Sequence, residues 1–172
     1  MWFTIPNLIC YFRVLLAYFA FYDFYNCHNA IRFFILTIIV VALDGLDGIV
    51  ARKLNQTTAL GAKIDIAADR ITELSYWLFF AYIEIAHIWI FYFFLLRGFL
   101  VDYLTRKLEK PLGKSFLRSS RFMRAFYGAL KLLSFLLLII LPKHLFTEII
   151  VYLTVLVCLL RAYPVLYSSL WR

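Results

Sequence analysis

The sequence of 172 residues is poor in charge: only 16% of its residues are Asp, Glu, Lys or Arg, whereas 65% are hydrophobic. A soluble domain has about 25% charged and about 45–50% apolar residues. Too few charged residues are present to cover the surface of a soluble domain of this length. The composition therefore predicts an integral membrane protein, long enough for about six spans of roughly 20 residues each.

Cysteine is also scarce. The three cysteines, Cys10, Cys27 and Cys158, form no C-x-x-C pair. The sequence thus gives no sign of a structural zinc site or a disulfide framework, and we interpret the cysteines as small hydrophobic packing residues. Internal repeats, low-complexity tracts and linkers are missing as well. We therefore expect one membrane domain over residues 1–172.

Long apolar runs are plentiful, and they predict an all-α integral membrane protein, a bundle of six transmembrane helices. The expected helices cover residues 8–25, 31–54, 62–82, 85–105, 125–141 and 146–167. The third is the least hydrophobic, because charged residues crowd its start.

Acidic residues are the rarer sign of charge: 10 Asp and Glu stand against 18 Lys and Arg. Most basic residues fall in the loops that follow the second and fourth expected helices. The positive-inside rule places these loops and both termini in the cytoplasm. Basic residues distributed in this way indicate orientation and attraction to anionic membrane lipids, and we expect no nucleic-acid partner.

Four of the few acids lie close together in "VALDGLDGIVARKLNQTTALGAKIDIAADR", residues 41–70. At spacings i, i+3, i+4, i+7 and i+8, one helix face carries Asp44, Asp47, Gly48, Ala51 and Arg52. At i, i+4 and i+8, a face of the next helix carries Gly61, Asp65 and Asp69. The short connection forces the two helices to run antiparallel. Both acidic faces can then look into one polar cavity that faces the cytoplasm.

Four carboxylates that face one another stay ionised together only when cations lie between them. Carboxylate oxygens suit Mg²⁺ or Mn²⁺, and four acids can hold two such ions. Glycines allow a ligand to approach the backbone closely, and Arg52 offers a guanidinium suited to phosphate. These are the components of a phosphoryl-transfer site.

The pattern Asp44-x2-Asp47-Gly48-x2-Ala51-Arg52-x8-Gly61-x3-Asp65-x3-Asp69 resembles, at all eight positions, the signature of the CDP-alcohol phosphatidyltransferases. The resemblance implies that an alcohol attacks the β-phosphate of CDP-diacylglycerol and that CMP is released. It implies that two Mg²⁺ or Mn²⁺ ions are surrounded by Asp44, Asp47, Asp65 and Asp69. It also places along the CDP moiety Gly48, Ala51, Arg52 and Gly61. Asp69 would be the general base for the acceptor hydroxyl. A homodimer is expected on the same likeness.

The acceptor is suggested by two longer stretches. "TIPNLICYFRVLLAYFAFY" and "ARKLNQTTALGAKIDIAADR" are most similar to eukaryotic-type phosphatidylinositol synthases, in which Arg commonly follows the last acid, as Arg70 does here. This likeness favours myo-inositol as the acceptor. Bacterial phosphatidylinositol-phosphate synthases share the Asp-Arg ending, so inositol phosphate is an alternative.

Phosphatidylglycerophosphate synthases, which use glycerol 3-phosphate, share "PNL…FRV" and "ARKLNQ". They usually have Pro and Lys where this chain has Ile66 and Arg70. Of their Gly-Lys-x-Lys-Thr stretch only Gly128 and Lys131 remain, and the Tyr-Tyr-x-x-Arg-like stretch of inositol synthases is matched loosely. Glycerol 3-phosphate therefore stays a second alternative.

Several other features have more than one explanation. A small cation channel or carrier would also place acids in a bundle, but it gives no reason for the spacing of the small residues and Arg52. We interpret Arg13 as snorkelling to the cytoplasmic surface and Glu73 as a supporting residue. We interpret Arg118, Arg121 and Arg124 as solvated surface charges; the alternative is that they bind a phosphate of the acceptor. The membrane would be the endoplasmic reticulum in a eukaryote and the inner membrane in a bacterium.

Overall fold

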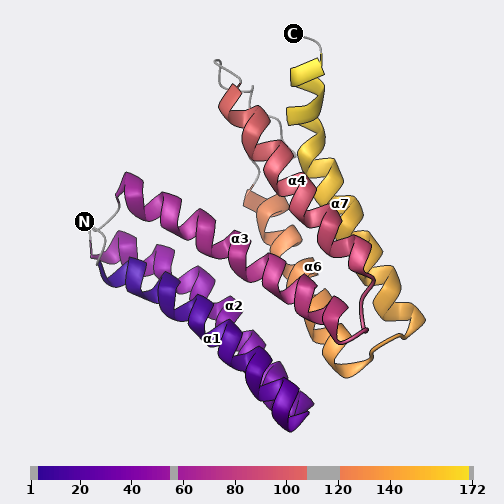
Figure 1. Cartoon of the computed structure of the whole chain (residues 1–172). Coiled ribbons are helices and arrows are strands. Elements are labelled where there is room, and N and C mark those ends of the chain that lie inside the picture. Colours follow the sequence, from indigo (N-terminus) through magenta and orange to yellow (C-terminus); the bar gives the residue numbers. More distant parts are fainter. Residues whose placement is uncertain (1–3, 55–57, 108–120, 171–172) are drawn as a thin grey trace. The chain divides into compact units, whose positions relative to one another are not determined.

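The computed structural model describes residues 4–54, 58–107 and 121–170 (Figure 1). In these ranges it is all-helical. The helices are α1 (Ile5–Cys27), α2 (Ala30–Lys53), α3 (Ala59–Tyr82), α4 (Ile88–Lys107), α6 (Arg121–Ile140) and α7 (Leu145–Leu170). All six expected helices are confirmed as helices, with ends that differ from the expected ones by a few residues.

Among the described residues, three helical segments are long and apolar enough to cross a membrane: Ile5–Cys27, Ala30–Ala51 and Leu145–Pro164. Two shorter segments, Ile88–Val101 and Ala125–Ile140, are also apolar. These segments fit an integral membrane protein. The bundle of six spans stays a prediction, because the described part of α3 carries charged residues near its start and two other apolar segments are short.

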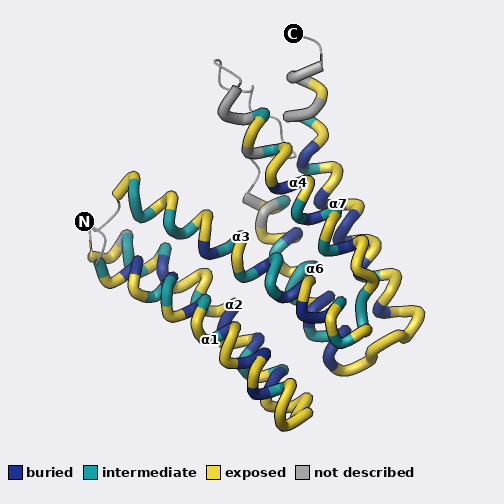
Figure 2. Tube along the Cα trace, in the orientation of Figure 1, coloured by how far each residue is buried: buried dark blue, intermediate teal, exposed yellow. Residues whose placement is uncertain are grey.

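The chain divides into two compact units, Met1–Phe79 and Phe80–Arg172. The first holds α1, α2 and most of α3, and the second holds the end of α3 with α4, α6 and α7. Each has buried residues along its helices (Figure 2). The single domain over residues 1–172 stays a prediction.

Aromatic packing fixes the helices of the first unit against one another. The ring of Phe21 on α1 lies 4.8 Å from that of Tyr76 and 4.6 Å from that of Phe79, both on α3. The hydroxyl of Tyr76 donates to Thr37 Oγ1 on α2 at 3.2 Å. Aromatic pairs add about 0.5–1.5 kcal/mol beyond their burial. Because α1 and α2 run antiparallel, this packing leaves the start of α1 beside the end of α2.

The first turn of α1 is buried and begins with a proline. Pro6 lies in the first turn, where its missing N–H has no intrahelical partner to lose. Pro6 and Asn7 are both buried. Their burial shows that this turn packs against its neighbours and helps to form the cavity described below.

Polar contacts join the helices of the second unit. The hydroxyls of Ser134 on α6 and Thr154 on α7 lie 2.8 Å apart, and both are buried. Phe80 and Phe135 pack with ring centroids 5.6 Å apart. A buried hydroxyl pair of this kind satisfies both groups without water, as an apolar helix pair requires.

Candidate functional site

A cavity of about 160 Å³ lies in the first unit, between the start of α1, the end of α2 and the start of α3. Its lining residues are Pro6, Asn7, Cys10, Asp47, Gly48, Ala51, Thr58, Gly61, Ala62 and Asp65. Five of the eight positions of the sequence pattern are among them. Residues from both predicted helix faces therefore line one cavity, whereas Asp44 and Asp69 are not among its lining residues.

Asp47 and Asp65 converge in this cavity with a third donor. Cys10 donates its thiol hydrogen to Asp47 Oδ2 at 3.1 Å. One ligand atom from each of Cys10, Asp47 and Asp65 lies within 4.8 Å of the others. Asp47 is buried, with 4% of its surface exposed.

Neither Asp47 nor Asp65 forms an ion pair with a basic side chain in the part of the chain that the structure describes. Two carboxylates this close repel each other unless a cation lies between them. Their oxygens are ligands that divalent cations prefer. The donor set of the cavity therefore fits a divalent metal ion.

Asp44 forms an ion pair with Arg13 and is not among the cavity-lining residues. The guanidinium Nη1 of Arg13 pairs with Asp44 Oδ1. The side chain of Arg13 is only 1% exposed, whereas that of Asp44 is 43% exposed. The interpretation that Arg13 snorkels to the surface is thus wrong: Asp44, on the neighbouring helix, supplies a counter-charge that keeps the guanidinium between α1 and α2.

Asp69 lies one turn beyond Asp65 on α3 and is half-buried. It is not among the described residues that line the cavity. In the next turn Arg70 Nη1 lies 3.7 Å from Glu73 Oε2, and Glu73 is buried. The structure therefore brings Asp47 and Asp65 into the cavity and leaves Asp44 and Asp69 beside it, each a turn away along its helix.

The structure does not describe the side chains of four basic residues that the sequence analysis singled out. The backbone of Arg52 belongs to α2, but its side chain is outside the described residues. The same holds for the side chains of Arg121 and Arg124 and for Arg118 as a whole.

The sequence profile of the CDP-alcohol phosphatidyltransferases matches residues 3–161 of the chain. The match contains the whole acidic pattern and extends into both compact units. The chain belongs to the CDP-alcohol phosphatidyltransferase family. No curated protein matches the sequence. Enzymes of this family transfer a phosphatidyl group from a CDP-alcohol to an acceptor alcohol in membranes, and they generally depend on a divalent metal.

Gly61 of this phosphatidyltransferase stands where α3 approaches α1. A Cβ atom at Gly61 would lie 3.0 Å from Thr58 Oγ1 and 3.1 Å from Asn7 Oδ1. Contacts this short force a neighbour to move. The glycine therefore preserves the space between the two helices at the cavity wall.

Five lining residues lie outside the predicted pattern, namely Pro6, Asn7, Cys10, Thr58 and Ala62, and Cys10 and Asn7 are two of the polar ones. Cys10 is buried, as expected of a packing residue, but its thiol is bonded to a carboxylate of the family pattern. A signal was present: Asn7, Cys10 and Arg13 follow one another at three-residue spacing, which places them on one face of α1. A polar face on an otherwise apolar helix marks the side that looks into a site.

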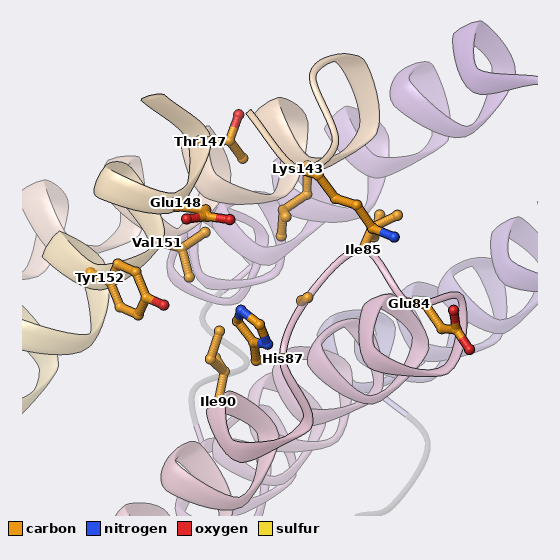
Figure 3. A pocket seen from close by; sticks show the side chains of 11 residues that line it. Glu84, Ile85, His87, Ile90, Lys143, Thr147, Glu148, Val151 and Tyr152 are labelled. Atoms are coloured by element: carbon orange, nitrogen blue, oxygen red, sulfur yellow. The ribbon is translucent and has the colours of Figure 1, made fainter. Parts of the chain in front are cut away.

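A second cavity, of about 210 Å³, lies in the second unit between the turn before α4 and the end of α6 with the start of α7 (Figure 3). Its charged lining residues are Glu84, His87, Lys143 and Glu148. No described residue of the family pattern lines it.

Proposed function

We propose that the chain transfers the phosphatidyl group of CDP-diacylglycerol to a hydroxyl of an alcohol, with myo-inositol as the favoured acceptor, and releases CMP. The observation that carries the proposal is the convergence of Asp47 and Asp65 in a cavity whose wall includes three small residues of the family pattern, Gly48, Ala51 and Gly61.

In this proposal four aspartates hold two Mg²⁺ or Mn²⁺ ions: Asp44, Asp47, Asp65 and Asp69. When bound, the ions neutralise charge that develops on the pyrophosphate. Small residues leave room along the wall for the CDP moiety, and Arg52 contributes a guanidinium toward phosphate. The placement of Asp44 and Asp69, each one turn from a cavity aspartate on the same helix, supports their assignment to the same site.

Asp69 is proposed as the general base. An alcohol is a weak nucleophile until a positioned base removes its proton. Asp69 takes that proton, the alcohol oxygen bonds to the β-phosphorus, and the bond from that phosphorus to the CMP oxygen breaks. Its half-buried position beside the cavity supports this role, because the acceptor must reach the base from outside the CDP site.

The setting of the site is part of the proposal. Six spans would place the cavity and the basic loops at the cytoplasmic side of the membrane, by the positive-inside rule. The membrane would be the endoplasmic reticulum or a bacterial inner membrane, and the enzyme would act as a homodimer.

The test is CMP release by the purified protein with CDP-diacylglycerol and Mg²⁺ or Mn²⁺. Myo-inositol, glycerol 3-phosphate, inositol 1-phosphate and serine are offered separately. Turnover with myo-inositol alone is the expected result. Turnover only with a phosphorylated acceptor would replace inositol by one of the two alternatives. If none of the four acceptors supports CMP release above background, the proposed acceptor class is contradicted. The variant Asp65→Asn sets the background rate.

A further inference from the structure

The metal-binding cavity contains a donor that a magnesium site does not need, the thiol of Cys10. Its sulfur and one oxygen each of Asp47 and Asp65 lie within 4.8 Å of one another. Cys10 is 2% exposed and Asp47 is 4% exposed. The three donors come from α1, α2 and α3, so the folded first unit assembles them.

The charges around the donors favour a cation. The lining of the cavity has no Lys, Arg or His among the described residues. Asp47, more than nine-tenths buried, also lacks an ion pair in those residues. Because burial of an ionised carboxylate is costly without a counter-charge, this side chain points to a bound cation.

The type of donor selects the type of cation. Mg²⁺ binds oxygen atoms and keeps several waters, whereas thiolate ligands select softer ions. Zn²⁺ accepts thiolate and carboxylate together in a tetrahedral shell, with bonds of about 2.3 Å and about 2.0–2.2 Å. Such a shell separates its ligand atoms by roughly 3.5 Å. The three donors lie within 4.8 Å of one another, so side-chain rotations would have to bring them to that spacing, and a tetrahedral shell would leave a fourth position for water.

We propose that Cys10, Asp47 and Asp65 form a binding site for Zn²⁺, and that zinc bound there inhibits phosphatidyl transfer by occupying the two carboxylates that the catalytic ion requires. The inhibitory part rests on the proposed function. The binding part rests on the three donors alone.

Binding requires no oxidation or reduction. The cation forms one bond to the Cys10 sulfur and one to each carboxylate. The thiol proton leaves to solvent, and the hydrogen bond from Cys10 to Asp47 is replaced by the shared ion.

The first experiment detects the metal–sulfur bond without turnover. The purified full-length protein is titrated with Cd²⁺, whose thiolate complexes have a charge-transfer absorption in the ultraviolet. We expect a band that saturates at one Cd²⁺ per chain and that Zn²⁺ abolishes by competition. The variant Cys10→Ser should lose the band, with Cys10→Ala as a second variant of smaller volume. Cys27→Ser, at an exposed free cysteine, should keep it.

The second experiment measures inhibition of CMP release by Zn²⁺, each variant relative to its own rate with Mg²⁺ alone. In Cys10→Ser the zinc concentration for half-inhibition should rise by roughly 10-fold or more, because one ligand is lost. Asp65→Asn should weaken Cd²⁺ binding in the first experiment by a similar factor.

The outcomes separate the two parts of the proposal. A band that persists in both Cys10 variants, or no band in the folded wild-type protein, overturns the zinc site. A band lost in Cys10→Ser with unchanged zinc inhibition overturns the inhibitory part alone. A band in a wild-type protein that releases CMP with none of the acceptors overturns the proposed function and leaves the zinc site standing.

Discussion

The cavity of the first unit and the cavity of the second unit have similar volumes, about 160 Å³ and about 210 Å³. The first is lined by two carboxylates and a thiol, with no basic residue among its described lining. The second has Glu84 and Glu148 together with His87 and Lys143, and Figure 3 shows Glu148 on α7 opposite His87. The second cavity thus has groups of both signs in its lining, whereas the two carboxylates of the first repel each other and favour a bound cation.

The two cavities also differ in the backbone that forms their walls. The first is walled by small residues on helices, such as Gly48 and Gly61. The second is formed by helix-connecting turns, and two of its residues, Glu84 and Lys143, have positive φ angles of 59°. Turns between helices enclose space as a consequence of chain reversal. Small residues at fixed helical spacing, in contrast, make room for a ligand, so charge and wall composition mark the candidate site better than volume does.

The largest expected effect is the loss of a cavity carboxylate. Asp47→Asn keeps the shape of the side chain but removes the charge that is proposed to hold a cation, and such an ion contributes several kcal/mol to the transition state. CMP release should fall by about 10³-fold or more. The matched change in the second cavity, Glu148→Gln, should leave the rate within about twofold, because a surface substitution changes energies by about 0.5 kcal/mol or less. Equal losses in both variants would contradict the distinction between the cavities.

A smaller effect is expected from a carboxylate beside the cavity. Asp69→Asn removes the proposed general base, so CMP release should fall by about 10²-fold or more. Binding of Mn²⁺, followed by electron paramagnetic resonance, should be weakened less by this change than by Asp65→Asn. Wild-type turnover in a folded Asp69→Asn protein would remove the general-base assignment.

Two ion pairs test how the first unit tolerates buried charge. In the pair of Arg13 and Asp44 the arginine is buried at 1% exposure, whereas in the pair of Arg32 and Asp23 the aspartate is buried at 9%. Removal of the exposed partner leaves the buried charge without compensation, which is costly in a membrane. Asp44→Asn should therefore lower stability by about 3–5 kcal/mol, more than Arg13→Met does.

The second pair should show the opposite order. Arg32→Met leaves Asp23 without its 2.7 Å partner and should cost more than Asp23→Asn. Thermal unfolding of the four variants in the same detergent measures both orders. If loss of the aspartate is the more costly change in both pairs, or loss of the arginine is, then burial of the remaining charge does not control the loss of stability.

The sequence predicts the helices and the family well because both depend on local pattern. Apolar runs mark the helices, and the fixed spacing of Asp47, Gly48 and Ala51 places them on one face. The family match over residues 3–161 confirms the resemblance seen in that spacing. A motif that is carried by the faces of two consecutive helices can be read without the tertiary structure.

Residues of α1 were harder to interpret, because their roles depend on partners far along the chain. Cys10 bonds to Asp47, 37 residues later, and Arg13 pairs with Asp44. An arginine in an apolar run is expected at the surface unless an acid on another helix meets it. Only the packing of α1 against α2 reveals that acid.

The smallest expected effect is the difference between the same substitution at two glycines, Gly61→Ala and Gly45→Ala. Gly61→Ala places a Cβ 3.1 Å from Asn7 Oδ1 at the cavity wall, whereas Gly45→Ala places one with no atom within 4 Å. Both changes raise helix propensity by about 1 kcal/mol, so Gly45→Ala should unfold at a slightly higher temperature. Gly61→Ala should instead raise the KM for CDP-diacylglycerol about fivefold, as expected for about 1 kcal/mol of crowding. An unchanged KM in both would mean that Asn7 and Thr58 move aside freely, and that the close approach of α3 to α1 does not shape the site.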